Sequence, residues 1–306
     1  MRKKVYSQVL PFQPNKTVLS QFGFLPVSVL NPTTKSKDKW TTAYIDQHSS
    51  ERRRSGGIQY LENLGFSEFH AGLAENIIRY WSLKGSVVVD PFAGRATRAV
   101  VSATLGREYY GYEISPFTFK RVTDHINSLS LDTSPTIYND DGCVMKETAD
   151  DVADLVFTCP PYWNLEEYED VPGQLSSAKS YADFMKFIIT CGENIYRVLK
   201  PGAFCVWVCA DFRGWEGNTG LYPFHVDTIN AFSKTGLTLY DVVILQNKSP
   251  FAALQMGKVA SKRYTSKIHE YILVFRKPGE YVVPDYCDTT EEDVADKFFD
   301  FTVSEE

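Results

Sequence analysis

The chain has 306 residues, of which 43% are hydrophobic and 14% aromatic, enough to bury a sizeable core. No apolar run reaches the roughly 20 residues of a membrane helix, and no apolar signal core follows the basic start, so we expect a cytoplasmic protein without a membrane partner. The formal net charge of -6, taken over the whole chain, argues against a nucleic-acid partner.

Two features of composition refine this picture. Nine acids and one base give residues 285–306 a charge of -8, which leaves +2 for residues 1–284. We therefore expect an acidic C-terminal tail over 285–306 and no acidic bias elsewhere. The six cysteines form no C-x-x-C pair and no cluster with histidine, so the sequence predicts neither a disulfide framework nor a metal site.

The chain divides into an irregular beginning and a regular body. Residues 1–65 carry scattered prolines and polar runs, which predict an arm with little regular structure. The folded domain is predicted over 66–284. It starts with a helix in the segment 67–85, with Ser67 as its N-cap and Gly85 as its stop, because apolar residues recur there at helical spacing.

Strands and helices then alternate. The predicted strands are 86–90, 107–114, 135–140, 153–158, 203–212, 237–246 and 269–277. Helices are predicted over 95–106, 116–130, 180–199 and 223–236. This alternation predicts an α/β fold with a doubly wound, Rossmann-like sheet that is mostly parallel. Only a loop joins the last two strands, which indicates an antiparallel pair at one end.

A cofactor is expected where the first strand ends, because ligands of open α/β sheets sit outside the carboxyl ends of the strands. The loop DPFAGRATRA after this strand has a single glycine, Gly94, and lacks the G-x-G-x-x-G spacing that binds a pyrophosphate. About twenty residues on, the next strand ends in Glu113, placed to accept hydrogen bonds from two ribose hydroxyls. The pattern favours a nucleoside cofactor without a pyrophosphate.

Several motifs together resemble the amino-methylating DNA methyltransferases, which modify adenine N6 or cytosine N4 with S-adenosylmethionine. DPFAG and LGREYYGYEISP resemble their cofactor motifs, TCPPYW their catalytic motif, and FHAGLAENIIRYWSLKG their cofactor helix. KPGAFCVWVCADFR and HEYILVFRK resemble later strands, and FGFLPVSVLN the start of small phage-like members. The similarity covers roughly 66–278 and implies a Rossmann-like methyltransferase domain.

The resemblance implies roles for individual residues. The cofactor-binding residues would be Phe69, His70, Asp90, Pro91, Phe92, Ala93, Gly94, Glu113, Ile114, Asp141 and Cys159. The catalytic residues would be Cys159, Pro160, Pro161 and Tyr162. At the end of the third strand Asp141 is preferred to Asp140 as the acid near the adenine, and a helix N-cap is the alternative role of either.

Two departures from the family pattern concern the site. The usual text after the first strand is DPF-x-G-S-G-T-T, whereas this chain has Arg95, Ala96, Thr97 and Arg98 after Gly94. Family members usually carry Asp, Asn or Ser where Cys159 stands, and a thiol is a weaker hydrogen-bond acceptor than an amide or carboxylate. A covalent role for Cys159 is disfavoured, because cytosine-C5 enzymes place a proline before their cysteine.

The expected chemistry needs a rigid loop more than a strong base. The lone pair of an exocyclic amine is delocalised into the base, so hydrogen-bond acceptors must localise it and hold it in line with the methyl donor. The prolines fix main-chain carbonyls around Cys159 and Pro160 for this purpose. Tyr162 is expected to stack on a flipped base, a contact of about 1–3 kcal/mol.

A basic stretch marks the expected path of DNA. The loop joining the last two strands, over 248–267, holds five bases and no acids. With Trp163 beside the catalytic motif, the predicted nucleic-acid contacts are Trp163, Lys258, Lys262, Arg263 and Lys267. Further candidates are Arg52, Arg53 and Arg54 and the loop 213–220. The alternative for the basic stretch 248–267 is a solvated loop without a binding role.

The sequence thus predicts a DNA methyltransferase acting on a flipped base of double-stranded DNA, with adenine N6 slightly ahead of cytosine N4. An RNA methyltransferase is the nearest rival, although no RNA-binding module precedes residue 66. A protein glutamine methyltransferase or a non-catalytic DNA-binding or cofactor-sensing scaffold are further alternatives. The choice between monomer and homodimer stays open.

Overall fold

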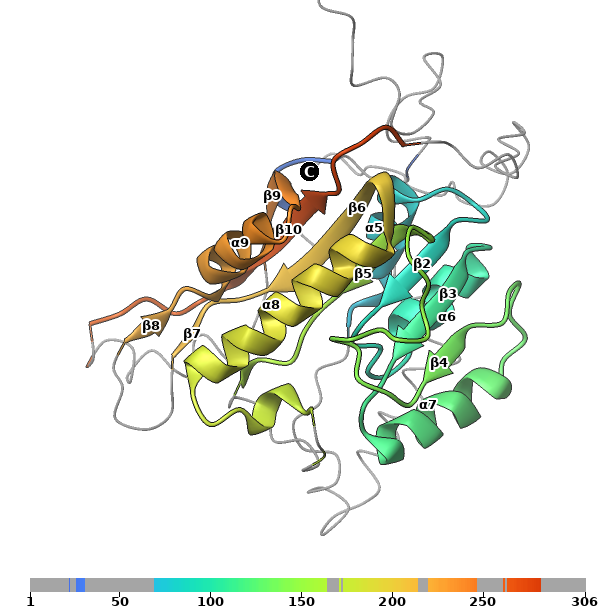
Figure 1. Cartoon of the computed structure of the whole chain (residues 1–306), viewed down its shortest axis with the longest axis horizontal. Helices are drawn as coiled ribbons and strands as arrows, with labels where there is room; N and C mark the ends of the chain where they lie inside the picture. The colour runs from blue at the N-terminus through green and yellow to red at the C-terminus, as the bar shows by residue number, and fades with distance from the viewer. Residues whose placement is uncertain are drawn as a thin grey trace, which may run out of the picture.

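A twisted eight-stranded sheet forms the centre of the computed structural model, which describes residues 22, 26–30, 69–163, 171, 173–213, 220–246, 261 and 263–281 (Figure 1). The strands are β1 (Val29–Leu30), β2 (Val87–Asp90), β3 (Glu108–Tyr112), β4 (Thr136–Tyr138), β5 (Ala153–Thr158), β6 (Leu199–Cys209), β9 (Thr238–Gln246) and β10 (His269–Arg276). Their order across the sheet is β1-β9-β10-β6-β5-β2-β3-β4. Only β10 runs against its neighbours, β6 and β9, among these strands.

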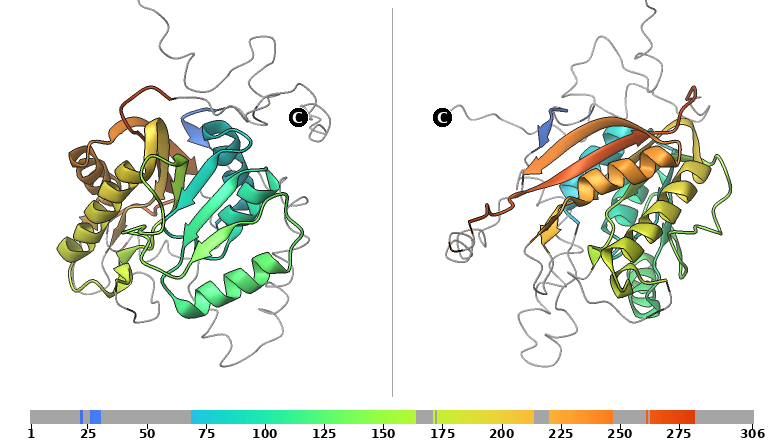
Figure 2. Two further views of the ribbon diagram at one scale, coloured as in Figure 1. Left: turned by 45° about the vertical axis from the view of Figure 1, so that its right-hand side comes forward. Right: turned by 60° about the vertical axis from the view of Figure 1, so that its left-hand side comes forward.

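Helices cover both faces of the sheet (Figures 1 and 2). They are α5 (Ala71–Trp81), α6 (Thr97–Thr104), α7 (Pro116–Asn127), α8 (Tyr181–Val198) and α9 (Phe224–Lys234), with the short 3-10 helix η4 (Leu175–Ser177). Helices α5 and α6 pack on one face and α8 and α9 on the other, while α7 lies beside β4. A small hairpin, β7 (Phe212–Arg213) and β8 (Leu221–Tyr222), follows β6.

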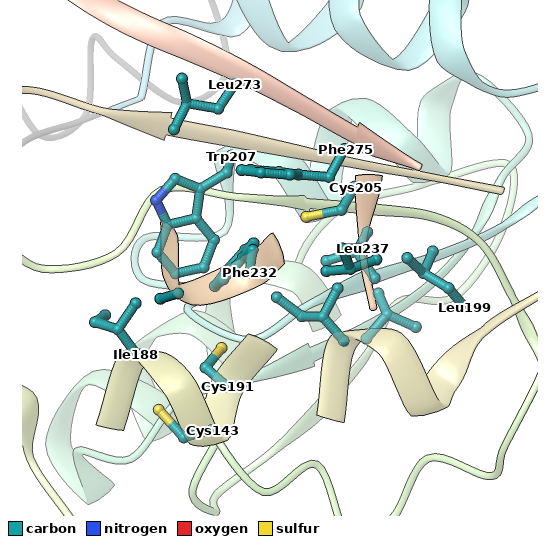
Figure 3. Packing of buried hydrophobic residues seen from close by; sticks show 14 of the residues in the cluster. Cys143, Ile188, Cys191, Leu199, Cys205, Trp207, Phe232, Leu237, Leu273 and Phe275 are labelled. Carbon is teal, nitrogen blue, oxygen red and sulfur yellow. The ribbon is translucent and has the colours of Figure 1, made fainter. Parts of the chain in front are cut away.

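Each face buries its own hydrophobic core, because side chains along a strand alternate between the two faces. On the α8 and α9 side, the ring of Phe232 lies 4.9 Å from those of Trp207 and Phe275, measured between centroids (Figure 3). On the other side, Ile77 and Ile78 of α5 join the valines of β6 in a second fully buried cluster. The strand ends are thereby held in register by packing on both faces.

The predicted fold class is confirmed: the sheet is doubly wound and mostly parallel, with an antiparallel pair, β9 and β10, towards one end. Differences concern boundaries. β6 begins at Leu199, four residues before the predicted start, because this segment already pairs with β5. The stretch 1–65, predicted to have little regular structure, contributes β1, which pairs with β9 through two residues.

Helix α5 starts later than expected. Its first residue is Ala71, and His70 is the N-cap, whose Nδ1 accepts a hydrogen bond of 3.2 Å from the amide of Leu73. Ser67, the predicted cap, lies outside the described residues. The helix ends at Trp81 rather than at the predicted stop, Gly85.

Several predicted segments lie outside the described residues. They include most of the arm 1–65, the tail 285–306 and most of the loop 213–220. Their boundaries with the domain over 66–284 stay predictions. In the part of the chain that is described, no helix combines the length and the apolar character needed to cross a membrane.

One glycine permits a close contact between two loops. Gly142 follows β4, and a Cβ added there would lie 1.8 Å from the carbonyl oxygen of Pro91, which follows β2. The backbone at Pro91 cannot move away without moving the end of β2. The two loops therefore approach each other over the end of β3 only because position 142 has no side chain.

Replacing Gly142 by alanine should lower the free energy of unfolding by about 3 kcal/mol or prevent folding, because the new methyl group collides with backbone atoms. Gly94→Ala is the matched control. Its Cβ would have 3.7 Å of clearance, so only the left-handed φ of 56° penalises it, by about 1 kcal/mol. Urea unfolding measures both, and equal losses would contradict the steric account.

Candidate active site

A cavity of about 380 Å³ opens at the carboxyl ends of the parallel strands. Its walls come from the segments that follow β2, β3, β4 and β5, together with the start of α5. Ten of the predicted cofactor-binding residues line it, namely Phe69, His70, Pro91, Phe92, Ala93, Gly94, Glu113, Ile114, Asp141 and Cys159. The other three predicted catalytic residues, Pro160, Pro161 and Tyr162, line it as well.

Asp90, the remaining residue expected to bind the cofactor, is not part of the described cavity lining. The side chain is fully buried, and its Oδ1 accepts hydrogen bonds from the amide of Phe92 (3.0 Å) and the hydroxyl of Thr158 (2.6 Å). Its Oδ2 accepts hydrogen bonds from Arg98 Nε (2.6 Å) and the hydroxyl of Tyr109 (2.7 Å). Four protein donors thus satisfy the carboxylate, and its role is to hold the surrounding segments together.

The backbone conformation accounts for the unusual residues after Gly94. Ala96 occupies the position of the family's second glycine and has a left-handed conformation, with φ 68° and ψ 0°. Gly94 also has a positive φ, of 56°. The loop therefore keeps the backbone shape that glycines usually permit, although an alanine in this region costs about 1–2 kcal/mol. The buried Cβ of Ala96 packs in the core on the α5 side.

Two acids mark the β3 and β4 side of the cavity. Glu113 follows β3 directly, and its Oε1 accepts a hydrogen bond of 2.8 Å from the amide of Ser115. Asp141 follows β4, and its Oδ1 accepts one of 2.8 Å from the amide of Cys143. Burial raises the pKa of Asp141, a shift that the amide of Cys143 reduces and the neighbouring Asp140 increases.

Asp140 has different surroundings from its neighbour Asp141. It forms an ion pair of 2.5 Å with Lys146 and does not belong to the described lining of the cavity. The hydrogen bond from Lys146 lowers its pKa. Beside Asp141, Gly173 leaves room against Ile114, since a Cβ there would lie 3.0 Å from the Cδ1 of Ile114.

The loop after β5 is held by aromatic packing. The ring of Tyr162 lies 6.2 Å from that of Phe212 and 6.4 Å from that of Phe224, measured between centroids. Trp163 donates a hydrogen bond of 3.0 Å from Nε1 to the carbonyl of Ala178 and is not among the described residues that line the cavity. Tyr162 therefore lines the cavity with aromatic neighbours beside it, and Trp163 links the loop to the segment at Ala178.

The predicted DNA-binding residues are only partly described. Arg263 and Lys267 are exposed on the connection between β9 and β10, and the guanidinium of Arg213 lies 4.5 Å from the ring centroid of Tyr264 on the same connection. This contact joins the end of β7 to the basic connection. Lys258, Lys262 and the arginine cluster Arg52, Arg53 and Arg54 lie outside the described residues.

The cavity also has walls that the sequence did not predict. These are Leu73, Arg95, Thr97, Arg98, Tyr112, Gly142, Gly173, Gln174, Leu175, Leu245 and Glu270. The sequence does contain a signal for Arg98. It is an arginine in the first turn of the helix that follows Asp90, the last residue of its strand. No sequence signal marks Leu245 or Glu270, because strand order alone brings β9 and β10 to this edge.

Fold and cavity together define a class of protein, a doubly wound α/β domain that binds a nucleoside cofactor at the strand ends. The N6/N4 methyltransferase family model, described as DNA methylase, matches residues 3–124 and 153–302. The chain belongs to this family, as the motifs implied. S-adenosylmethionine is accordingly its cofactor.

Curated relatives include two type II methyltransferases from archaea. The chain is 27% identical over 164 residues to M.MthZI of Methanothermobacter thermautotrophicus, covering 49% of this chain and 46% of that protein. It is 26% identical over 175 residues to M.MjaI of Methanocaldococcus jannaschii, covering 49% and 58%. The chain thus spans about half the length of the curated relatives it matches.

The solved structures that this one matches include a SAM-dependent methyltransferase of Methanosarcina mazei. Its TM-score is 0.48 at 11% identity, over 67% of this chain and 98% of that chain. TrmN of Thermus thermophilus has a TM-score of 0.46 at 12% identity, over 68% of this chain and 49% of that chain.

The residues of the cavity fit S-adenosylmethionine. Glu113 would offer a carboxylate to ribose hydroxyls, and Asp141 follows the neighbouring strand beside Ile114, which would offer an apolar surface to a purine. The missing side chain of Gly173 leaves space there. Within the described residues, no three His, Cys, Asp or Glu side chains gather as metal ligands would.

Glu113→Gln should weaken binding of S-adenosylhomocysteine about tenfold or more, because hydrogen bonds to a charged acceptor are worth about 1.5–3 kcal/mol. Glu108→Gln is the matched control. Glu108 is an exposed acid at the start of β3, the strand that Glu113 follows, and is not part of the described cavity lining. Calorimetric titration should separate the two variants; equal affinities for both would contradict the ribose role of Glu113.

Proposed function

We propose that the protein transfers a methyl group from S-adenosylmethionine to the exocyclic amine of a base in double-stranded DNA. One observation carries this proposal. The loop Pro160, Pro161 and Tyr162 lines the same cavity as the cofactor acids Glu113 and Asp141. This shared lining supports the proposal, because in-line transfer requires the methyl donor and the acceptor in one space.

The chain's own residues prepare the amine. S-adenosylmethionine supplies an electrophilic methyl group, so the protein needs only to orient the amine and accept hydrogen bonds from it, while the proton released from the methylated nitrogen passes to solvent. Main-chain carbonyls near Cys159 and Pro160 accept hydrogen bonds from it, and the two prolines keep this backbone rigid. Because the Cys159 thiol is a weak acceptor, these carbonyls do most of the work.

Tyr162 holds the base outside the double helix. Its ring is half-buried and supported by Phe212 and Phe224. Stacking on a base contributes about 1–3 kcal/mol, comparable with the few kcal/mol that flipping costs. Arg263 and Lys267, exposed beyond the cavity, would bind the phosphates of the flanking strand.

Adenine N6 is the acceptor we propose first, and cytosine N4 is the alternative. The alternative is favoured by Trp163, the residue after Tyr162, because a tryptophan in this place is more typical of the cytosine enzymes. The sheet and the cavity serve both acceptors equally, since each base presents its amine next to a ring nitrogen.

Incubation with unmethylated double-stranded DNA and methyl-labelled S-adenosylmethionine, followed by digestion and mass spectrometry of nucleosides, tests the proposal. We expect labelled N6-methyldeoxyadenosine; labelled N4-methyldeoxycytidine would support the alternative. Label found only in RNA or protein, or on C5 of cytosine, would overturn both. Tyr162→Ala should lower the yield at least tenfold, whereas Tyr240→Ala, an exposed tyrosine of β9 outside the cavity lining, should not.

A further inference from the structure

A buried arginine forms part of the cavity wall. Arg98 is 5% exposed and stands in the first turn of α6. Its Nε donates a hydrogen bond of 2.6 Å to Asp90, and its Nη2 donates one of 2.5 Å to the carbonyl of Phe92. The guanidinium carbon lies 5.0 Å from the ring centroid of Phe69 and 5.8 Å from that of Phe157. These contacts fix the plane and position of the guanidinium.

The arginine keeps donors that these contacts do not use. A guanidinium has five N–H donors, and within the described part of the chain Nη1 makes no hydrogen bond. Arg98 also lines the cavity, so an acceptor bound there can reach the remaining donors.

The charge of Arg98 is secure despite its burial. Burial opposes the charged form, but the charge and hydrogen bond of Asp90 outweigh it and raise the pKa of Arg98 above its ordinary value. The side chain is therefore a permanent cation. Its planar fork suits a carboxylate better than a lysine would, because two parallel hydrogen bonds can form.

The sheet order separates the two ends of the cavity. Glu113 and Asp141 follow β3 and β4, on one side of β2. Arg98 contacts Phe157 of β5, the neighbour of β2 on its other side, and Phe69 before α5. A cofactor with its nucleoside against Glu113 and Asp141 directs its amino-acid end towards Arg98.

We propose that Arg98 binds the carboxylate of the cofactor's amino-acid end and selects ligands that carry this group. The guanidinium would then bridge two carboxylates, that of Asp90 inside the protein and that of the ligand in the cavity. The proposal rests on S-adenosylmethionine occupying this cavity, and it is independent of which base receives the methyl group.

Two neighbours compete for the same role. Arg95 also lines the cavity, but it is partly exposed, so water screens its charge. The N-terminus of α5 presents backbone amides nearby, and one of them, that of Leu73, already donates to His70. Arg98 is the only cation of the described cavity lining that is more than nine-tenths buried.

The test compares two ligands on one protein. S-adenosylhomocysteine and its decarboxylated analogue differ only in the carboxylate, and calorimetry gives the ratio of their affinities. In the wild type we expect a preference for the carboxylate of about 10- to 100-fold, the range for a hydrogen bond to a charged group. In Arg98→Met the preference should fall below about threefold, while Arg95→Met keeps the wild-type ratio.

A second variant guards against misfolding. Arg98→Met leaves Asp90 buried without its cation, whereas Asp90→Asn together with Arg98→Met removes both charges and should show the same lost preference. An undiminished ratio in either variant would overturn the role of Arg98, as would a wild type that does not discriminate. If neither ligand binds the wild type, the cofactor assignment fails, and with it this proposal. A retained preference without DNA methylation would overturn only the proposed function.

Discussion

A single buried carboxylate ties together the segments that build the cavity. Asp90, the last residue of β2, accepts hydrogen bonds from the backbone of its own loop, from α6, from β3 and from β5. Burying a charge is tolerable only when such partners replace its water. Any shift of one of these segments would leave part of the charge uncompensated, so the strand ends are fixed relative to each other.

The hydrogen bonds of Asp90 extend to both sides of the proposed reaction, the acceptor loop and the cofactor. Thr158, which donates to Asp90, is the last residue of β5, and the loop that we propose to be catalytic starts with the next residue, Cys159. Arg98, which pairs with Asp90, lines the cavity where we propose that the cofactor's amino-acid end binds. In the proposed reaction, one carboxylate would therefore position both the methyl donor and the loop that orients the acceptor amine, which suits a transfer whose rate depends on alignment.

Local patterns predicted most of the fold, and contacts across the sheet account for what they missed. The alternation of strands and helices, and the acids at strand ends such as Glu113, are properties of short segments. β1 has only two residues and forms because β9 offers an edge. The inward direction of Asp90 and its pairing with Arg98 depend on a turn in which Ala96 adopts a left-handed conformation, which residue types alone do not reveal.

Urea unfolding of wild type, Asp90→Asn, Arg98→Met and the double variant tests most directly whether this carboxylate organises the site. Each single change breaks a buried pair and should lower the free energy of unfolding by about 3–5 kcal/mol. The double variant should lose at least about 2 kcal/mol less than the sum of the single losses, because the pair is removed as a unit. Additive losses would contradict the account, since Asp90 and Arg98 would then act independently.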